Sequence, residues 1–199
     1  MRSESKKNLS LFIIVIFFIA FVYATIKAMN IVDQTHVGTS NGIYRSYVTT
    51  SKEIHDKAFT LTEHCTDELC EVQSLLDFAT NIPYQTNTFQ QYSAQETIQQ
   101  NFGDCDDKSN LLISMLHALG KEAYFVLVPK HIFIIISIDD KRLDEKKGLW
   151  INGKKYYILE STAKDSKVGF PLRYKLDDID VIVEPFSNEK RPIEKLEWR

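Results

Sequence analysis

The stretch Gly103–Ser109 reads Gly-Asp-Cys-Asp-Asp-Lys-Ser and runs directly into an apolar helical pattern, and it constrains the fold more than any other part of the sequence. Apolar residues recur there at helical spacing, which predicts a helix that buries one face: Leu112, Met115, Leu116 and Leu119. Asp104 suits the N-cap position, and Asp107 suits the return bond of a capping box. Cys105 precedes Leu112 by two helical turns and is therefore expected on the side of the core.

Two interpretations of Cys105 follow from this position. The N-terminus of a helix carries partial positive charge and free N–H groups, which lower the pKa of a thiol and can hold an oxyanion. A free cysteine on the core side of a helix is, however, most often inert and buried. The helix alone leaves both interpretations open.

Length and charge exclude some classes of function. The chain has 199 residues, enough for one ordinary domain plus an appendage, and its formal net charge is −3. No basic face stands out, so nucleic acid is not an expected partner. Three cysteines do not make a disulfide scaffold, although one pair remains open.

The N-terminal segment is almost wholly apolar from residue 9 to residue 26 and is bounded by basic residues: Arg2, Lys6, Lys7 and Lys27. About 18 to 20 apolar residues suffice to cross a bilayer as a helix. We therefore expect a transmembrane signal-anchor helix over 9–27, a cytoplasmic tail over 1–8 and the rest of the chain outside the cytoplasmic membrane, periplasmic or extracellular. Cleavage after Val22-Tyr23-Ala24 is the alternative, because these residues also fit a signal-peptide site.

A juxtamembrane linker is expected over 28–50 and a folded domain over 51–199. Helical patterns begin at Ser51 and cover about 68–79. Cys65 and Cys70 lie between these helices and are a candidate disulfide outside the cytoplasm, provided that the chain turns there. Their spacing, even with the neighbouring His64, does not fit a usual zinc site.

Strand patterns follow the cysteine helix. They cover 122–128, 132–138, the two arms of a hairpin around Asn152-Gly153, and 180–183, while the Lys/Glu-rich tail from Ser187 is expected at the surface. His131 begins the second of these strands, and Glu160 ends the second arm of the hairpin. Taken alone, each is more often a surface or hydrogen-bonded residue than a catalytic one.

A cysteine at a helix start, a histidine at a strand start and an acid at a strand end, in this order, resemble the transglutaminase-like, papain-type superfamily of cysteine peptidases, in its bacterial transglutaminase-like cysteine proteinase form. The motifs that carry the resemblance span about 51–170: Ile82-Pro83-Tyr84, Ala94–Ile98, Gly103–Ser109, Ala118-Leu119-Gly120, His131–Ile134, Tyr157–Thr162 and Gly169. The resemblance implies an α+β, papain-like fold in which N-terminal helices, including the nucleophile helix, pack on an antiparallel sheet. With the apolar N-terminal segment, the expected architecture is this fold preceded by one transmembrane helix.

The resemblance also implies a catalytic triad: Cys105 as nucleophile, His131 as general base and acid, and Glu160 as the orienting carboxylate. The family usually has Asp within a Leu-Asp-Pro-Thr-like motif at the third position, so Glu160 is a departure. With His131 as its partner, Cys105 is expected to be a thiolate. Its backbone N–H is one oxyanion donor, and Gln99 or Tyr84 is the candidate for the second.

Some periplasmic relatives with a similar acidic box require calcium near the cysteine. Asp104, Asp106 and Asp107 resemble that box and offer oxygen ligands, but helix capping accounts for the same residues, so no cofactor is expected.

The sequence therefore predicts a membrane-anchored cysteine hydrolase that cleaves peptide bonds in a protein or peptide substrate through a thioester. Two alternatives stay open: transglutaminase-type acyl transfer to an amine, and a non-catalytic transglutaminase-like binding module.

Overall fold

The computed structural model describes residues 12–26, 36–39, 42–45, 48, 50–86 and 91–199, and the chain divides into two compact units, 1–36 and 37–199. In the first unit, residues 12–26 are helical and their large apolar side chains are exposed. Among the described residues, no helix combines the length and the apolar character needed to cross a bilayer. The predicted span 9–27 extends beyond the described helix at both ends and the tail 1–8 lies outside the described residues, so both stay predictions.

The segment 28–50, predicted as a linker, contains two strands, β1 (His36–Thr39) and β2 (Gly42–Arg45), which pair with each other. The polar and glycine-containing composition of this stretch did not indicate strands.

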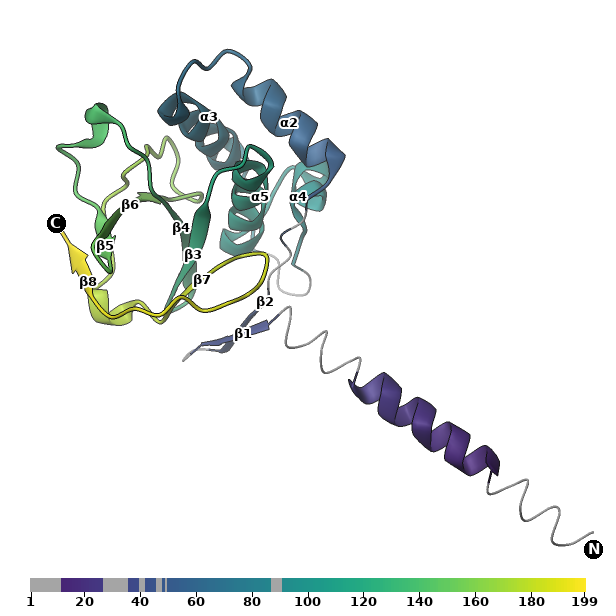
Figure 1. Cartoon of the computed structure of the whole chain (residues 1–199). Helices are drawn as coiled ribbons and strands as arrows, with labels where there is room; N and C mark the ends of the chain where they lie inside the picture. The colour runs from purple at the N-terminus through teal and green to yellow at the C-terminus, as the bar shows by residue number, and fades with distance from the viewer. Residues whose placement is uncertain (1–11, 27–35, 40–41, 46–47, 49, 87–90) are drawn as a thin grey trace, which may run out of the picture. The chain divides into compact units, whose positions relative to one another are not determined.

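The second unit contains a layer of four helices (Figure 1): α2 (Lys52–Thr62), α3 (Glu68–Asn81), α4 (Ala94–Gln100) and α5 (Cys105–Ala118). Each begins at a side chain that accepts a hydrogen bond from the first turn: Ser51, Asp67, Ser93 and Asp104. The predicted helices after Ser51, over 68–79 and after Cys105 are thus confirmed. Gly120 ends α5 with a φ of +72°, the left-handed conformation that glycine adopts most readily.

One side of these helices packs on an antiparallel sheet with the strand order β7-β3-β4-β6-β5-β8. The strands are β3 (Ala123–Val128), β4 (His131–Ile136), β5 (Leu149–Ile151), β6 (Lys154–Leu159), β7 (Val181–Val183) and β8 (Leu196–Trp198), and short 3-10 turns lie at Lys141–Leu143 and Leu176–Asp178. The sheet curls away from the helices (Figure 1). The α+β architecture predicted from the sequence is confirmed.

Alternation along the strands divides the core into two clusters, one on each face of the sheet. On β4, Ile132, Ile134 and Ile136 pack toward the helices. Phe133 and Ile135 pack on the opposite face, which the C-terminal segment covers. Because alternate residues of a strand share a face, His131, two residues before Phe133, lies on the second face as well.

The predicted hairpin is confirmed: Asn152 and Gly153 join β5 to β6 with positive φ angles of 51° and 86°. The tail after Ser187 lies at the surface as expected, since most of its residues are exposed and none is buried. It also contains a strand that was not expected: β8 pairs with β5, and the half-buried Leu196 and Trp198 pack on the second face of the sheet. Three residues between charged neighbours were too short a pattern to indicate a strand.

Cys65 and Cys70 are joined in a disulfide with Cα atoms 5.4 Å apart. The chain turns between them, because α2 ends at Thr62 and Asp67 caps the start of α3. His64 lies beside the bond, with its Nε2 3.7 Å from the sulfur of Cys65.

Candidate active site

Cys105 is the first residue of α5, and the loop before it is tightly held. Asp104 accepts hydrogen bonds from the backbone N–H groups of Asp106 and Asp107, and the side chain of Asp107 accepts one from the N–H of Asp104. Gly103 leaves no room for a side chain, since a Cβ there would lie 2.8 Å from the Cβ of Asp107. Its N–H donates to the carbonyl of Pro83, which fixes the loop against the segment after α3.

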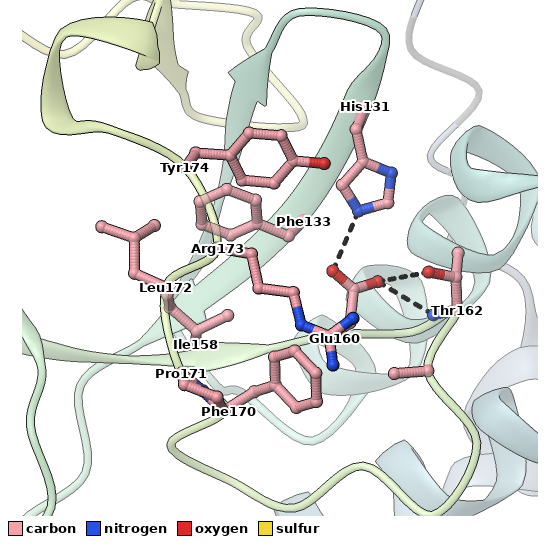
Figure 2. Close-up of a pocket in the computed structure, with 11 residues that line it drawn as sticks. His131, Phe133, Ile158, Glu160, Thr162, Phe170, Pro171, Leu172, Arg173 and Tyr174 are labelled. Carbon is pink, nitrogen blue, oxygen red and sulfur yellow. Dashed lines mark hydrogen bonds and ion pairs between the residues drawn. The ribbon is translucent and has the colours of Figure 1, made fainter.

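His131 and Glu160 meet because β4 and β6 are antiparallel neighbours. The imidazole Nε2 lies 2.9 Å from Oε2 of Glu160. The other carboxylate oxygen, Oε1, accepts hydrogen bonds from the backbone N–H and the hydroxyl of Thr162, at 3.0 and 2.6 Å (Figure 2). Both oxygens of Glu160 are therefore engaged, and the carboxylate is fixed in place.

Hydrogen bonds keep Glu160 charged. Burial acts to raise the pKa of this carboxyl, but the bonds from His131 and Thr162 outweigh burial and hold the pKa below its ordinary value of 4.5. With Nε2 of His131 occupied by Glu160, Nδ1 is the ring nitrogen left for a second partner, and Figure 2 shows it on the opposite edge of the ring.

The thiol of Cys105 is half-buried beside carboxylates. The Sγ of Cys105 donates to Oδ1 of Asp106 at 3.6 Å. Cys105 and His131 both belong to the described part of the chain, and no hydrogen bond joins Sγ to the imidazole there. Burial, followed by the charges of Asp106 and Asp104, raises the pKa of the thiol well above its ordinary value. This direction is opposite to the one expected from the helix N-terminus, because burial and then the two neighbouring acids disfavour the charged form of the thiol.

Two electrostatic contacts connect the thiol side of the site to the His131–Glu160 pair. Burial raises the pKa of Asp106, and the nearby His131 acts in the opposite direction. The pKa of Tyr174 is raised by burial first, and then by the charges of Glu160 and Cys105. The ring of Tyr174 stacks on His131 at 5.9 Å between centroids. The start of α5, the start of β4 and the end of β6 therefore lie close enough for their side chains to interact electrostatically.

The three acids proposed as calcium ligands are already engaged by protein groups. Asp104 caps α5, Asp106 accepts from the side chain of Gln91 at 2.8 Å, and Asp107 accepts from the backbone of Tyr92 at 2.6 Å. Burial raises the pKa of Asp107 to about 6. Helix capping and loop attachment thus account for these carboxylates, and calcium binding, the alternative that the resemblance left open, is not tested.

The two candidates for the second oxyanion donor differ in position. Tyr84 is bridged through its backbone to Gly103, and the pKa of its phenol is raised by burial and then by the charge of Cys105. Gln99 lies on α4, and both side chains are exposed. Only Tyr84 of this pair has a recorded electrostatic contact with the cysteine. The role itself stays a prediction.

A pocket of about 240 Å³ adjoins the His131–Glu160 pair, and sequence reasoning missed most of its lining: His131, Phe133, Ile158, Glu160, Thr162, Ala163, Phe170, Pro171, Leu172, Arg173 and Tyr174. Residues 170–174 form one wall (Figure 2). This segment contains Gly169-Phe170-Pro171, residues typical of a turn, and no periodicity that would indicate which side chains point inward.

An α+β domain with a cysteine-led helix and a histidine–carboxylate pair on the adjoining sheet is the arrangement that the motifs implied. Residues 55–133 match the family model of the transglutaminase-like superfamily, which confirms the resemblance over that segment. The match includes Cys105 and His131 and ends before Glu160. No curated protein matches the chain in sequence.

Two solved structures are similar to the chain. One is a "putative cysteine protease" from Cytophaga hutchinsonii, with 18% identity and a TM-score of 0.43 over 77% of this chain and 54% of that protein. The other is LapG from Legionella pneumophila, with 13% identity and a TM-score of 0.39 over 61% of this chain and 77% of LapG. The chain thus spans about half the length of the first.

Replacing Asp106 by asparagine should make the thiol more reactive. Because Asp106 raises the pKa of Cys105, removing its carboxylate should lower that pKa. At a pH below the thiol pKa, the alkylation rate should rise about threefold for each pH unit by which the pKa falls, since a tenfold gain in thiolate is partly offset by the lower nucleophilicity of that thiolate. Iodoacetamide labelling from pH 7 to 10 measures this, and Cys105 is the free cysteine of the chain. Asp177→Asn, at an exposed turn, is the control. An unchanged rate profile would mean that Asp106 does not set the thiol pKa.

Proposed function

We propose that the protein is a membrane-anchored cysteine hydrolase that cleaves peptide bonds outside the cytoplasm with Cys105, His131 and Glu160. The observation that carries the proposal is the 2.9 Å contact between Nε2 of His131 and Glu160, which fixes the imidazole and leaves Nδ1 for the thiol. The match to the transglutaminase-like superfamily over 55–133, which includes the cysteine and the histidine, supports the same chemistry.

In the proposed reaction, Nδ1 of His131 takes the proton of the Cys105 thiol while the sulfur attacks the carbonyl carbon of the substrate amide. Proton transfer during attack suits a thiol whose pKa is raised at rest. The backbone N–H of Cys105 has no recorded acceptor among the described residues and is a donor for the oxyanion. When the intermediate collapses, His131 gives the proton to the leaving nitrogen and a thioester remains.

Hydrolysis of the thioester completes the cycle. A water molecule gives one proton to His131 and attacks the thioester carbon, the carbon–sulfur bond breaks, and His131 returns the proton to the sulfur. Glu160 stays ionised throughout and stabilises the imidazolium in both steps.

Two features support a location outside the cytoplasm. Residues 12–26 form a helix whose large apolar side chains are exposed, as a membrane segment requires. The Cys65–Cys70 disulfide suits an oxidising compartment. We therefore place the N-terminus in the cytoplasm and the catalytic domain outside. Labelling intact cells with a membrane-impermeant maleimide after reduction should modify Cys65 and Cys70, and failure to label them before lysis would contradict this topology.

Peptide cleavage tests the catalytic proposal. The full chain, purified in detergent, is incubated with a peptide library, and new termini are identified by mass spectrometry. We expect cleavage that Cys105→Ala abolishes. Addition of an amine distinguishes acyl transfer, since a transglutaminase would attach that amine to the product. Identical cleavage patterns for the wild type and Cys105→Ala would refute the proposal.

A further inference from the structure

We infer that the hydrogen bond between Ser109 of α5 and Ser161, the residue after Glu160, positions the thiol of Cys105 relative to the His131–Glu160 pair. Both serines are positioning residues, since they are fully buried and cannot touch a substrate. The inference rests on the proposed peptidase function and adds the contact that joins the nucleophile helix to the strand of the orienting carboxylate. It is carried by the burial of the two hydroxyls and by their places in the chain.

The two hydroxyls depend on each other. Their oxygens lie 3.1 Å apart, and both serines are 0% exposed. Within the described part of the chain, neither hydroxyl bonds to a further protein group. A buried polar group that loses its partner keeps the cost of its desolvation, so removal of either hydroxyl leaves the other unsatisfied. The bond therefore holds together two segments that lie 52 positions apart in the sequence.

Ser161 and Glu160 face opposite sides of the sheet. Along β6, Ile158 packs on the second face and Leu159 packs toward the helices. This alternation continues past the end of the strand, because Glu160 bonds to His131 on the second face whereas Ser161 bonds to α5. Two consecutive residues thus hold the imidazole on one side and the nucleophile helix on the other. A shift of Ser161 would move Glu160 with it.

Ser109 lies on the face of α5 that carries Cys105. The two residues are four positions apart, which is about one turn and ~6 Å along the helix axis. The capping box of Asp104 and Asp107 fixes the first turn, so the place of Ser109 determines the place of the cysteine. The bond to Ser161 therefore connects the cysteine to the end of β6.

The neighbouring polar side chains of α5 bond to other parts of the fold. Asp106 accepts from Gln91, Asp107 accepts from the backbone of Tyr92, and Lys108 donates to the end of α3. These bonds attach the helix to α3 and to the segment before α4, and apolar packing on the sheet has no preferred direction. The serine pair adds a directional bond between the start of α5 and β6.

Loss of this bond should lower kcat and leave KM unchanged. A misplacement of about 1 Å between reacting groups costs up to ~10²-fold in rate, and we expect about tenfold for Ser109→Ala and for Ser161→Ala, because packing still limits the movement. Neither serine touches the substrate, so binding should not change. The double variant should be no slower than either single variant, since all three lack the same bond. Both constants are measured on one peptide from the library.

Two further variants separate positioning from packing. Ser161→Thr keeps the hydroxyl and should retain most of the wild-type kcat. Ser114→Ala is the matched control, because Ser114 is equally buried on α5 but lies half a turn around the helix from Cys105. It should lower the melting temperature without lowering kcat. If Ser114→Ala loses as much kcat as Ser109→Ala, destabilisation of α5 alone slows the reaction and the inference is overturned.

A second measurement does not depend on cleavage. Iodoacetamide labelling of Cys105 across pH is compared with and without His131→Gln, first in the wild type and then in Ser109→Ala. We expect His131→Gln to alter the labelling profile in the wild type and to alter it less in Ser109→Ala. An equal effect in both backgrounds would overturn the inference. Absence of cleavage dependent on Cys105 would instead refute the proposed function, while the labelling comparison would still decide whether the serine pair sets the distance from thiol to imidazole.

Discussion

Replacing His131 by glutamine should lower kcat/KM for peptide cleavage by roughly 10²–10⁴-fold, the usual contribution of a general acid and base. The loss is expected to be large because the raised thiol pKa gives Cys105 little thiolate of its own, so that attack requires a base. The substitution also removes the acid that protonates the leaving nitrogen. Rates measured on one peptide from the library, with wild type and variant at equal folded concentration, give the ratio.

Two further variants separate catalysis from packing. Glu160→Gln keeps the size of the side chain but removes the charge that stabilises the imidazolium, so we expect an intermediate loss in kcat. Thr162→Val removes one of the two bonds that hold Oε1 of Glu160 and should cost less. His117→Gln replaces a histidine near the far end of α5 and should leave the rate unchanged. Equal activity of His131→Gln and the wild type would exclude His131 from the reaction.

The sequence predicted the parts of the fold that local chemistry determines. Asp104 and Asp107 specify the start of α5 through hydrogen bonds within four residues, and both bonds are present. Asn152-Gly153 specifies the hairpin because both residues accept positive φ angles. Cys105, His131 and Glu160 each lie at the end of a regular element, as the sequence indicated, and His131 meets Glu160; their catalytic roles stay a prediction.

What escaped prediction depends on contacts between distant residues. The wall over 170–174 has no regular structure, and Tyr174 reaches His131 because this segment packs on the second face of the sheet. The pairing of β8 with β5 joins segments nearly fifty residues apart. The direction of the thiol pKa shift escaped prediction for a related reason: the sequence places two acids beside Cys105 but shows neither the burial of the thiol nor the direction of its hydrogen bond.

Lys108 is the buried residue of α5 whose role the sequence did not reveal. Its side chain is 1% exposed, and Nζ donates to the carbonyls of Ile82 and Thr80 at 2.8 and 3.4 Å. Both carbonyls lie at the C-terminal end of α3, where a helix carries partial negative charge. Lys108 therefore joins α3 to the helix that begins with Cys105. Burial lowers the pKa of Lys108 to about 8, although the charge of Glu160 opposes the shift.

Replacing Lys108 by methionine should destabilise the fold by about 2–6 kcal/mol at pH 10, since two buried carbonyls lose their donor. At that pH the wild-type amine is mostly neutral and still has two N–H groups for the two carbonyls. At pH 7 the wild type bears the cost of a buried cation, and methionine removes it, so the difference between the two proteins should be smaller. Urea unfolding of the full chain at several pH values measures both free energies.

The sign of the pH dependence follows from the two pKa values. Between about 8 in the folded state and 10.5 in the unfolded state, the unfolded chain holds a proton that the folded protein has released, so stability rises with pH. Relative to Lys108→Met, the wild type should gain up to ~3 kcal/mol across this range. Lys121→Met is the matched control: Lys121 pairs with Glu68 and Glu71 near the surface, and its loss should cost about 1 kcal/mol or less. If the difference in unfolding free energy between the wild type and Lys108→Met stays constant from pH 7 to 10.5, the pKa of Lys108 is not lowered in the folded state, and the prediction is wrong.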